Sequence, residues 1–174
     1  SLDRPDQVMP AGEKGEVCVR GPQVMPGYWQ NETATRETFV DGWLKTGDVG
    51  YADQDGYIFL VDRLKDVILC SGYNVYPRAI EEALYLHEQI AEVTVIGVPD
   101  QYRGQAPKAF VRLKDNVTDV TAEDLRTFLD DKISRIEMPR EIEIREELPK
   151  TMVGKLSKKE LVEEERLKRE GKAQ

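Results

Sequence analysis

The pattern of residues changes near residue 62, and this change constrains the fold more than any other feature of the 174-residue chain. Before it, short β-forming stretches are separated by turn signals such as Asp41-Gly42 and the segment 53–56. After it, segments with helical spacing of apolar residues alternate with strands rich in β-branched residues. The sequence therefore predicts an α+β protein. A β-rich part, residues 1–61, precedes a charged link, residues 62–66, and a small α+β domain, residues 67–174.

The expected elements follow from these patterns. Pro77 is well placed in the first turn of a helix, whose apolar face runs from Ile80 to Ala91. Thr121 caps another helix, with Asp124 at its third position. In order, we expect a strand at 16–20, a short helix at 31–39, a pair of strands at 57–61 and 67–70 joined by the charged link, a helix from 77, strands at 93–98 and 109–113, a helix from 121, a strand at 142–145 and a helix from 157.

The charge balance argues against several classes of protein. Aspartate and glutamate number 33 against 25 lysines and arginines, which gives a net charge of −8. A net-acidic chain is a poor partner for the phosphate backbone of nucleic acids, so no nucleic-acid partner is expected. No apolar run approaches the ~18 residues that a transmembrane helix needs. The N-terminus lacks the regions of a signal peptide, so the expected location is the cytoplasm.

The use of histidine and cysteine restricts the chemistry further. His87 is the only histidine, which argues against His-based metal sites and Ser-His-Asp catalysis. Cys18 and Cys70 lie far apart and lack the spacing of a zinc or redox motif, so no metal site is expected and a reducing compartment fits. If the protein is an enzyme, lysine, arginine and carboxylate side chains must carry its chemistry.

Asp48 is the first candidate binding residue. It follows Thr46-Gly47 in a segment that we expect to be a loop between strands. A carboxylate in such a place can accept hydrogen bonds from two adjacent hydroxyls, as acidic residues do with ribose, or it can bond to its own turn. The charged link at 62–66 is either a solvated turn or a hinge whose charges exchange partners.

Gly72 and Lys155 are the other candidates. Gly72 follows a strand, where glycine permits either the close approach of a ligand or a turn with positive φ. Lys155 follows Gly154 at the end of a flexible loop. Such a lysine can place a charge on a phosphate, or it can be an ordinary surface lysine before a helix. The loop is not a Walker A loop, which needs a more glycine-rich run.

Taken together and in order, these segments resemble the C-terminal third of the adenylate-forming superfamily, which includes acyl-CoA synthetases, luciferases and adenylation domains. The matching blocks are GEVCVRGPQVMPGYW (15–29), GWLKTGD (42–48), DGYIFLVDRLKDVILCSGYNVYPRAIEEAL (55–84), VIGVPD (95–100) and LPKTMVGK (148–155). The SGYNVYP stretch (71–77) is most similar to bacterial medium- and long-chain fatty acid:CoA ligases. The resemblance implies adenylation of a fatty acid by ATP and then thioester formation with coenzyme A.

The resemblance also implies roles for the candidate residues. Asp48 would bind both ribose hydroxyls of the nucleotide, and Arg63 would contact its ribose or phosphate region. Lys65 would be the hinge about which the C-terminal domain rotates. Gly72 would line the pantetheine tunnel in the thioester-forming state. Lys155 would bridge the acyl carboxylate and the α-phosphate during adenylation.

The sequence departs from the family pattern at three positions. Asp62 stands where many relatives have glycine, and Leu69 stands where luciferases carry a lysine, which argues against a light-emitting reaction. Gln105 replaces a frequent glutamate, and no role is assigned to it.

The phosphate-binding loop, the magnesium-binding glutamate and the acyl pocket of the family have no counterpart in these residues. We therefore expect a piece of a longer enzyme that uses ATP, Mg²⁺ and coenzyme A, with the Mg²⁺ ligands outside this chain and the piece inactive alone. Residues 1–61 should expose apolar surface that could mediate homo-oligomerisation. Two alternatives stay open: an adenylating enzyme that serves a carrier protein or an oxidation, and a non-catalytic interaction module.

Overall fold

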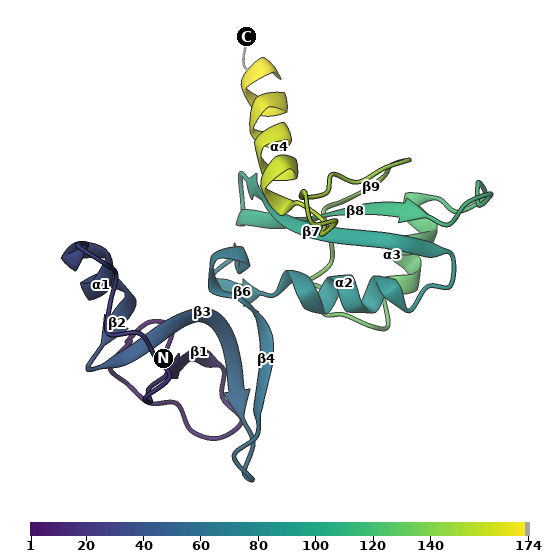
Figure 1. Ribbon diagram of the computed structural model, residues 1–174. Coiled ribbons are helices and arrows are strands. Elements are labelled where there is room, and N and C mark those ends of the chain that lie inside the picture. The colour runs from purple at the N-terminus through teal and green to yellow at the C-terminus, as the bar shows by residue number, and fades with distance from the viewer. Residues whose placement is uncertain (173–174) are drawn as a thin grey trace. The chain divides into compact units, whose positions relative to one another are not determined.

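The structure is a computed structural model that describes residues 1–172 (Figure 1). The chain forms two compact units, Ser1–Lys65 and a second unit that begins at Asp66. The border falls inside the charged segment 62–66, at the point where the sequence pattern changes. Within residues 1–172, no helix has both the length and the apolar character required to cross a membrane.

The first unit is built on a twisted antiparallel sheet. Its strands are β1 (Gly15–Val19), β2 (Phe39–Val40), β3 (Trp43–Ala52) and β4 (Ile58–Arg63), and β3 pairs with each of the other three. A short helix, α1 (Glu32–Thr38), begins where the Asn31 side chain accepts a hydrogen bond from the Ala34 N–H, at 3.0 Å. The strand at 16–20 and the helix at 31–39 are thus confirmed to within a residue or two.

The segment around Asp48 is part of strand β3 and not a loop between strands, so that expectation was wrong. The register of β1 against β3 shifts between Glu16 and Cys18, which leaves residues 46–48 as a bulge inside the strand. Gly47 has φ of +75° in this bulge. The bulge therefore places glycine in the middle of a strand, where the sequence pattern indicates a turn.

Apolar side chains of the first unit are exposed along β4 and its preceding turn. Tyr57, Ile58, Phe59 and Leu60 have exposed fractions of 70%, 59%, 45% and 56%. Val49 is the one hydrophobic residue of Ser1–Lys65 among the buried core side chains. The exposed apolar surface expected for residues 1–61 is therefore present.

The second unit is a mixed five-stranded sheet. Its strands are β5 (Ile68–Cys70), β6 (Tyr73–Val75), β7 (Ile90–Asp100), β8 (Gly104–Leu113) and β9 (Glu141–Ile144). The order is β6-β5-β8-β7, and β9 adds to β8 in the parallel direction. A single 3₁₀ turn, η1 (Leu64–Asp66), precedes β5.

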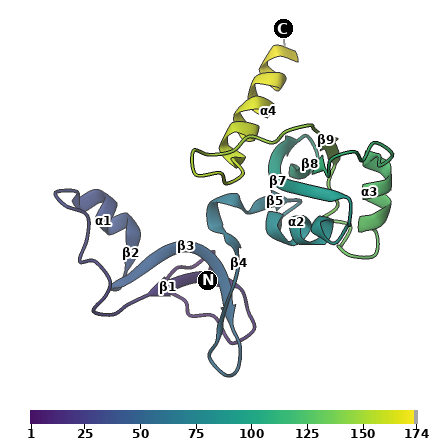
Figure 2. The ribbon, with the colours of Figure 1, turned by 45° about the vertical axis from the view of Figure 1, so that its right-hand side comes forward.

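Helices cover both faces of this sheet (Figures 1 and 2). The helices are α2 (Pro77–Tyr85), α3 (Ala122–Leu129) and α4 (Lys158–Lys172). Buried residues of α2 and α3 pack with Val93, Val95 and Val111 in one core. Leu161 of α4 packs with Ile96 and Phe110 in a second core on the other face. Alternate residues of β7 and β8 thus serve opposite faces, as the two-residue period of a strand requires.

Two expectations for the strands and helices after residue 56 were wrong. The strands at 57–61 and 67–70 do not pair: β4 pairs with β3, and β5 pairs with β6 and β8. The helix from Pro77 ends at Tyr85, so Ala91 lies in β7 and not on the helix face. His87 lies in the turn between them, with its ring edge-on to Phe128, at 4.8 Å between centroids.

Candidate functional site

Asp48 and Arg63 lie side by side on adjacent strands of the first unit's sheet. They are direct partners in the β3 and β4 register, and Arg63 Nε lies 3.9 Å from Asp48 Oδ1. Both side chains remain in water, with exposed fractions of 37% for Asp48 and 65% for Arg63. An exposed ion pair this long contributes little to stability. Both groups therefore remain free to bind a ligand that carries hydroxyls or negative charge.

Lys65 lies beside this pair. It lines the same open hollow of about 510 Å³, together with Thr46, Gly47 and Leu64. Its side chain is exposed, within the 3₁₀ turn that ends the first unit. The structure thus brings together three of the predicted site residues, Asp48, Arg63 and Lys65, in one hollow with two cations and one carboxylate.

Gly72 occupies the tip of the hairpin formed by β5 and β6. The pair Cys70 and Tyr73 closes a two-residue loop, Ser71-Gly72, with φ of +51° and +82°. Positive φ at both positions is the signature of a type I′ turn, which favours glycine. A Cβ placed on Gly72 would meet no atom within 4 Å. The turn alone therefore explains the glycine, and the space in front of it is open to a ligand.

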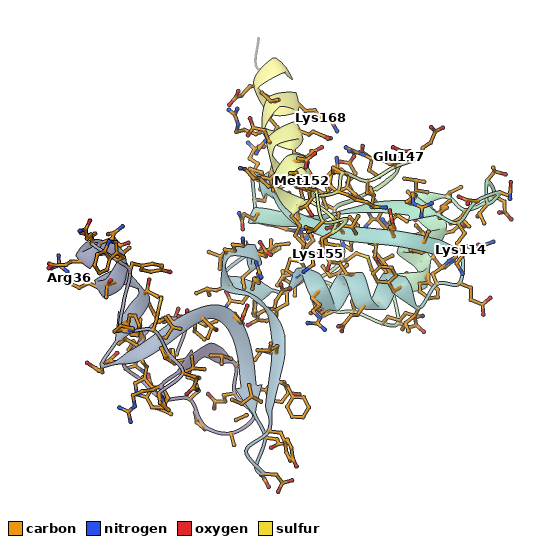
Figure 3. All side chains as sticks on the ribbon, in the orientation of Figure 1. Arg36, Lys114, Glu147, Met152, Lys155 and Lys168 are labelled. Atoms are coloured by element: carbon orange, nitrogen blue, oxygen red, sulfur yellow. The ribbon has the colours of Figure 1, made fainter. Side chains whose placement is uncertain are left out.

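Lys155 lies in a short hairpin, residues 150–156, which we call the Lys155 hairpin. Its turn is closed by a hydrogen bond from the Thr151 N–H to the Lys155 carbonyl, at 2.7 Å, and Lys150 bridges to Leu156. Gly154 has φ of +79°, which this turn requires. Among residues 1–172, no ion pair involves the Lys155 ammonium group, and its side chain is exposed (Figure 3). The charge is therefore available for a phosphate or carboxylate.

Two ion pairs fix the ends of the Lys155 hairpin. Lys150 Nζ lies 2.6 Å from Glu92 Oε1 at its start, and Lys158 Nζ lies 2.8 Å from Glu81 Oε1 just after its end. Hydrogen bonding from Lys150 lowers the pKa of Glu92 from its usual value, so the carboxylate stays charged. The hairpin is thereby tied to β7 and α2 although its tip is exposed.

A buried lysine joins α4 to the sheet. The Lys108 side chain is only 4% exposed, and its Nζ lies within 3.0 Å of Glu141, Glu143 and Glu165. Burial alone would raise the pKa of Glu143, but hydrogen bonds from Lys108 and Arg145 hold it at about 2. Since Glu165 belongs to α4, this network positions the helix that follows the Lys155 hairpin. No role for Lys108 was predicted from the sequence. A lysine within an otherwise apolar strand is nevertheless a recognisable sign of a buried, paired charge.

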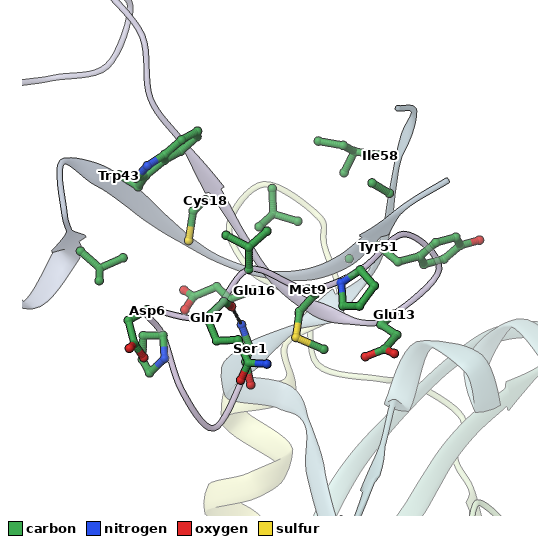
Figure 4. A pocket seen from close by; sticks show the side chains of 18 of the residues that line it. Ser1, Asp6, Gln7, Met9, Glu13, Glu16, Cys18, Trp43, Tyr51 and Ile58 are labelled. Carbon is green, nitrogen blue, oxygen red and sulfur yellow. Dashed lines mark hydrogen bonds between the residues drawn. The ribbon is translucent and has the colours of Figure 1, made fainter. Parts of the chain in front are cut away.

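A second cavity in the first unit contains none of the predicted site residues (Figure 4). Its volume is about 380 Å³. It is lined by the N-terminal segment around Met9, and also by Trp43 and Tyr51 of β3. Cys18 also lies in its wall, where burial and then the charge of Glu16 raise the pKa of the thiol. A raised pKa disfavours the reactive thiolate, which makes Cys18 a poor nucleophile in this cavity.

The predicted site residues therefore form two groups, one in each unit. Asp48, Arg63 and Lys65 belong to the first unit, and Gly72 and Lys155 to the second. Among residues 1–172, no three His, Cys, Asp or Glu side chains are grouped so that they could hold a metal ion. The first unit thus presents one hollow that contains Asp48, Arg63 and Lys65. The second unit presents two exposed hairpins, one with Gly72 and one with Lys155.

Residues 79–155 match the AMP-binding enzyme C-terminal domain. The chain therefore resembles the C-terminal part of the adenylate-forming enzymes, and its residues 79–155 carry the C-terminal domain of that family.

The chain is also similar to curated ligases. It is 50% identical over 153 residues to the long-chain-fatty-acid–CoA ligase of Bacillus subtilis (strain 168), covering 88% of this chain and 27% of that protein. It is 46% identical over 172 residues to the ligase of the same name from Salmonella typhimurium (strain LT2), covering 99% of this chain and 30% of that one. The chain thus spans less than a third of the length of these two relatives.

Solved structures share the fold. The ATP-bound RpMatB-BxBclM chimera B1 superposes with a TM-score of 0.84 at 35% identity, over 90% of this chain and 31% of that one. The o-succinylbenzoate CoA synthetase of Bacillus subtilis, in complex with its acyl-adenylate intermediate, gives 0.82 at 34% identity, over 92% and 32%. Both matches place the α+β architecture in this family.

Proposed function

We propose that the chain is part of an ATP-dependent fatty acid:CoA ligase that acts on medium- or long-chain acids. What supports this most is the 50% identity to a long-chain-fatty-acid–CoA ligase over 88% of the chain. The geometry of the candidate residues agrees with it, because each is exposed or half-exposed, and the charged groups of Asp48, Arg63 and Lys155 are not locked in a strong ion pair. The segments that the family resemblance rests on include every candidate residue.

In the first half-reaction, a carboxylate oxygen of the fatty acid forms a bond to the α-phosphorus of ATP, and pyrophosphate leaves. Asp48 accepts hydrogen bonds from the two ribose hydroxyls, and Arg63 contacts the nucleotide beside it. Lys155 places its ammonium group between the two anions as they approach. A preorganised cation stabilises charge that develops on the phosphoryl oxygens.

In the second half-reaction, the coenzyme A sulfur forms a bond to the acyl carbon, AMP leaves, and the thiol proton is lost. The open face of the Gly72 turn admits the pantetheine arm. Lys65 is the pivot at which the second unit reorients between the two steps. Such ligases use Mg²⁺, and the described residues supply no ligand set for this ion.

The test is product analysis with the complete protein, ATP, Mg²⁺ and palmitate, with and without coenzyme A. We expect pyrophosphate release and palmitoyl-CoA. Acyl-AMP without acyl-CoA would favour an enzyme that serves a carrier protein, and neither product would favour a non-catalytic module. The 174-residue chain alone is the matched control, and we expect it to release no pyrophosphate above background.

A further inference from the structure

The tip of the Gly72 hairpin is tied to the sheet by very few bonds. Strand β5 meets β8 at a single residue pair, Cys70 and Gly104. On one side of this pair, the Ser71 N–H donates to the Arg103 carbonyl at 2.8 Å. On the other side, the Leu69 N–H donates to Oε1 of Gln105 at 2.9 Å. A side chain thus supplies one of the two acceptors that flank the contact.

The main chain of β8 cannot extend this pairing. Two residues beyond Gln105, Pro107 has no N–H to donate. The Pro107 carbonyl instead accepts from the Arg140 N–H at 2.8 Å, and β9 pairs with β8 from Lys108 onward. The edge of β8 is therefore divided between β5 and β9, and Gln105 stands at the division.

The Gln105 side chain is held in place by its neighbours. It is half-buried, and its Oε1 would lie 3.5 Å from a Cβ added to Gly97 on β7. The same added Cβ would lie 3.2 Å from Cγ1 of Ile68, which is buried in the core. Glycine at position 97 thus leaves the space that the amide of Gln105 and the side chain of Ile68 occupy.

Packing holds one face of this hairpin, where Ile68, Cys70 and Val75 are buried in the core, and leaves the other face exposed. The side chains of Leu69 and Tyr73 are 58% and 66% exposed, so they contribute little burial. Strands of three residues are short, and a two-stranded hairpin is marginally stable without further support. On the exposed face, the bond from Leu69 to Gln105 adds a constraint on where the Ser71-Gly72 turn lies, beside the burial of Cys70 and the bond from Ser71.

We propose that Gln105 is a positioning residue for thioester formation: its side-chain oxygen, by holding the Leu69 N–H, fixes the Gly72 turn that the pantetheine arm passes. This inference rests on the proposed ligase function, which gives the Gly72 turn its role. It assigns no contact between Gln105 and a substrate.

Three variants separate this role from simple stability. Gln105→Met keeps the length of the side chain and removes the acceptor, whereas Gln105→Glu keeps an acceptor oxygen. Gln101→Met makes the same chemical change at an exposed residue of the neighbouring β7–β8 turn and is the matched control.

The first measurement is amide hydrogen exchange by NMR on the 174-residue chain. We expect Gln105→Met to speed exchange at Leu69 about 5- to 10-fold, as the loss of one hydrogen bond of about 1 kcal/mol implies. Gln105→Glu and Gln101→Met should leave it near the wild-type rate, and the Arg145 amide, bonded to Val111, should not change in any variant. Unchanged exchange at Leu69 in Gln105→Met would overturn the inference, whatever the enzyme activity.

The second measurement uses the complete ligase and separates its half-reactions. We expect Gln105→Met to slow thioester formation from preformed acyl-AMP about 10-fold, to leave acyl-AMP formation unchanged, and to be rescued by Gln105→Glu. Equal loss in both half-reactions would overturn the positioning role. If wild-type protein forms no acyl-CoA while Leu69 exchange responds as expected, the ligase function fails and the hydrogen bond stands as a purely structural feature.

Discussion

The Asp48 carboxylate and the Arg63 guanidinium are 3.9 Å apart on neighbouring strands, and both are largely in water. A shorter, buried pair would consume the hydrogen-bonding capacity of both groups. At this separation each keeps acceptors or donors for a ligand, and the strand register keeps the two groups together. The pair therefore suits a ligand with two adjacent hydroxyls, which donate to the carboxylate, and a negative charge, which the guanidinium attracts.

At Gly72 a backbone requirement and the proposed role beside the pantetheine arm coincide. Its φ of +82° costs a non-glycine residue about 1–2 kcal/mol, whereas no atom lies close enough to clash with a Cβ. We predict that Gly72→Ala lowers the free energy of unfolding of the chain by about 1 kcal/mol, measured by urea denaturation. Gly72→Asn should lose less, because asparagine tolerates this conformation better. A loss above about 4 kcal/mol would mean that the position is crowded.

The sequence predicted some elements well because their signals are local. Thr121 and Asp124 form the expected capping box at the start of α3, since capping depends on residues three apart. The end of α2 was misjudged, because Ala91 keeps the helical spacing but belongs to a strand whose partner is β8. Periodicity within a window cannot detect pairing with residues some 20 positions away.

The candidate site shows the same division. Motif order supplied Asp48, Arg63, Lys65, Gly72 and Lys155 by resemblance, and the structure adds how each is held. Gln105 escaped because its role depends on a side-chain bond to Leu69, 36 positions earlier in the chain. No local pattern records such a bond.

The contact of α4 with the sheet depends on charge, and its strength should depend on pH. Glu143 has a pKa of about 2 in the folded chain against 4.5 for a free side chain. Its contribution to stability is therefore present above pH 4.5 and is lost as pH falls toward 2, because the unfolded chain then binds the proton more readily.

We predict that the free energy of unfolding falls between these pH values by on the order of 2–3 kcal/mol through Glu143. Urea denaturation at a series of pH values measures it. Glu143→Gln should flatten the pH dependence and Glu146→Gln, at an exposed position of the same segment, should not. An unchanged slope in Glu143→Gln would show that Lys108 and Arg145 do not stabilise that carboxylate.

The border between the two units falls inside residues 64–66, which form a single 3₁₀ turn. Hinges absorb a large change of φ and ψ at very few residues. The division of the candidate residues between the units makes such a hinge useful, because the Lys155 hairpin and the Gly72 turn serve different half-reactions in the proposed function.

We predict that Lys65→Pro in the complete ligase keeps acyl-AMP formation and slows thioester formation. Proline fixes φ near −65° and restricts Leu64 before it, so reorientation at the pivot is hindered. Lys65→Ala is the control, since it removes the charge and leaves the dihedral free, and its effect should be mild. Thioester formation at the wild-type rate in Lys65→Pro would place the pivot elsewhere.

In the proposed function, this chain contributes a lysine to one half-reaction of a ligase and a glycine turn to the other. The most direct test is Lys155→Ala in the complete protein, with the two half-reactions measured separately. Acyl-AMP formation should fall about 10²- to 10³-fold, the usual cost of losing one preorganised stabilising group. Thioester formation from preformed acyl-AMP and coenzyme A should stay near the wild-type rate, and an equal loss in both half-reactions would contradict the account.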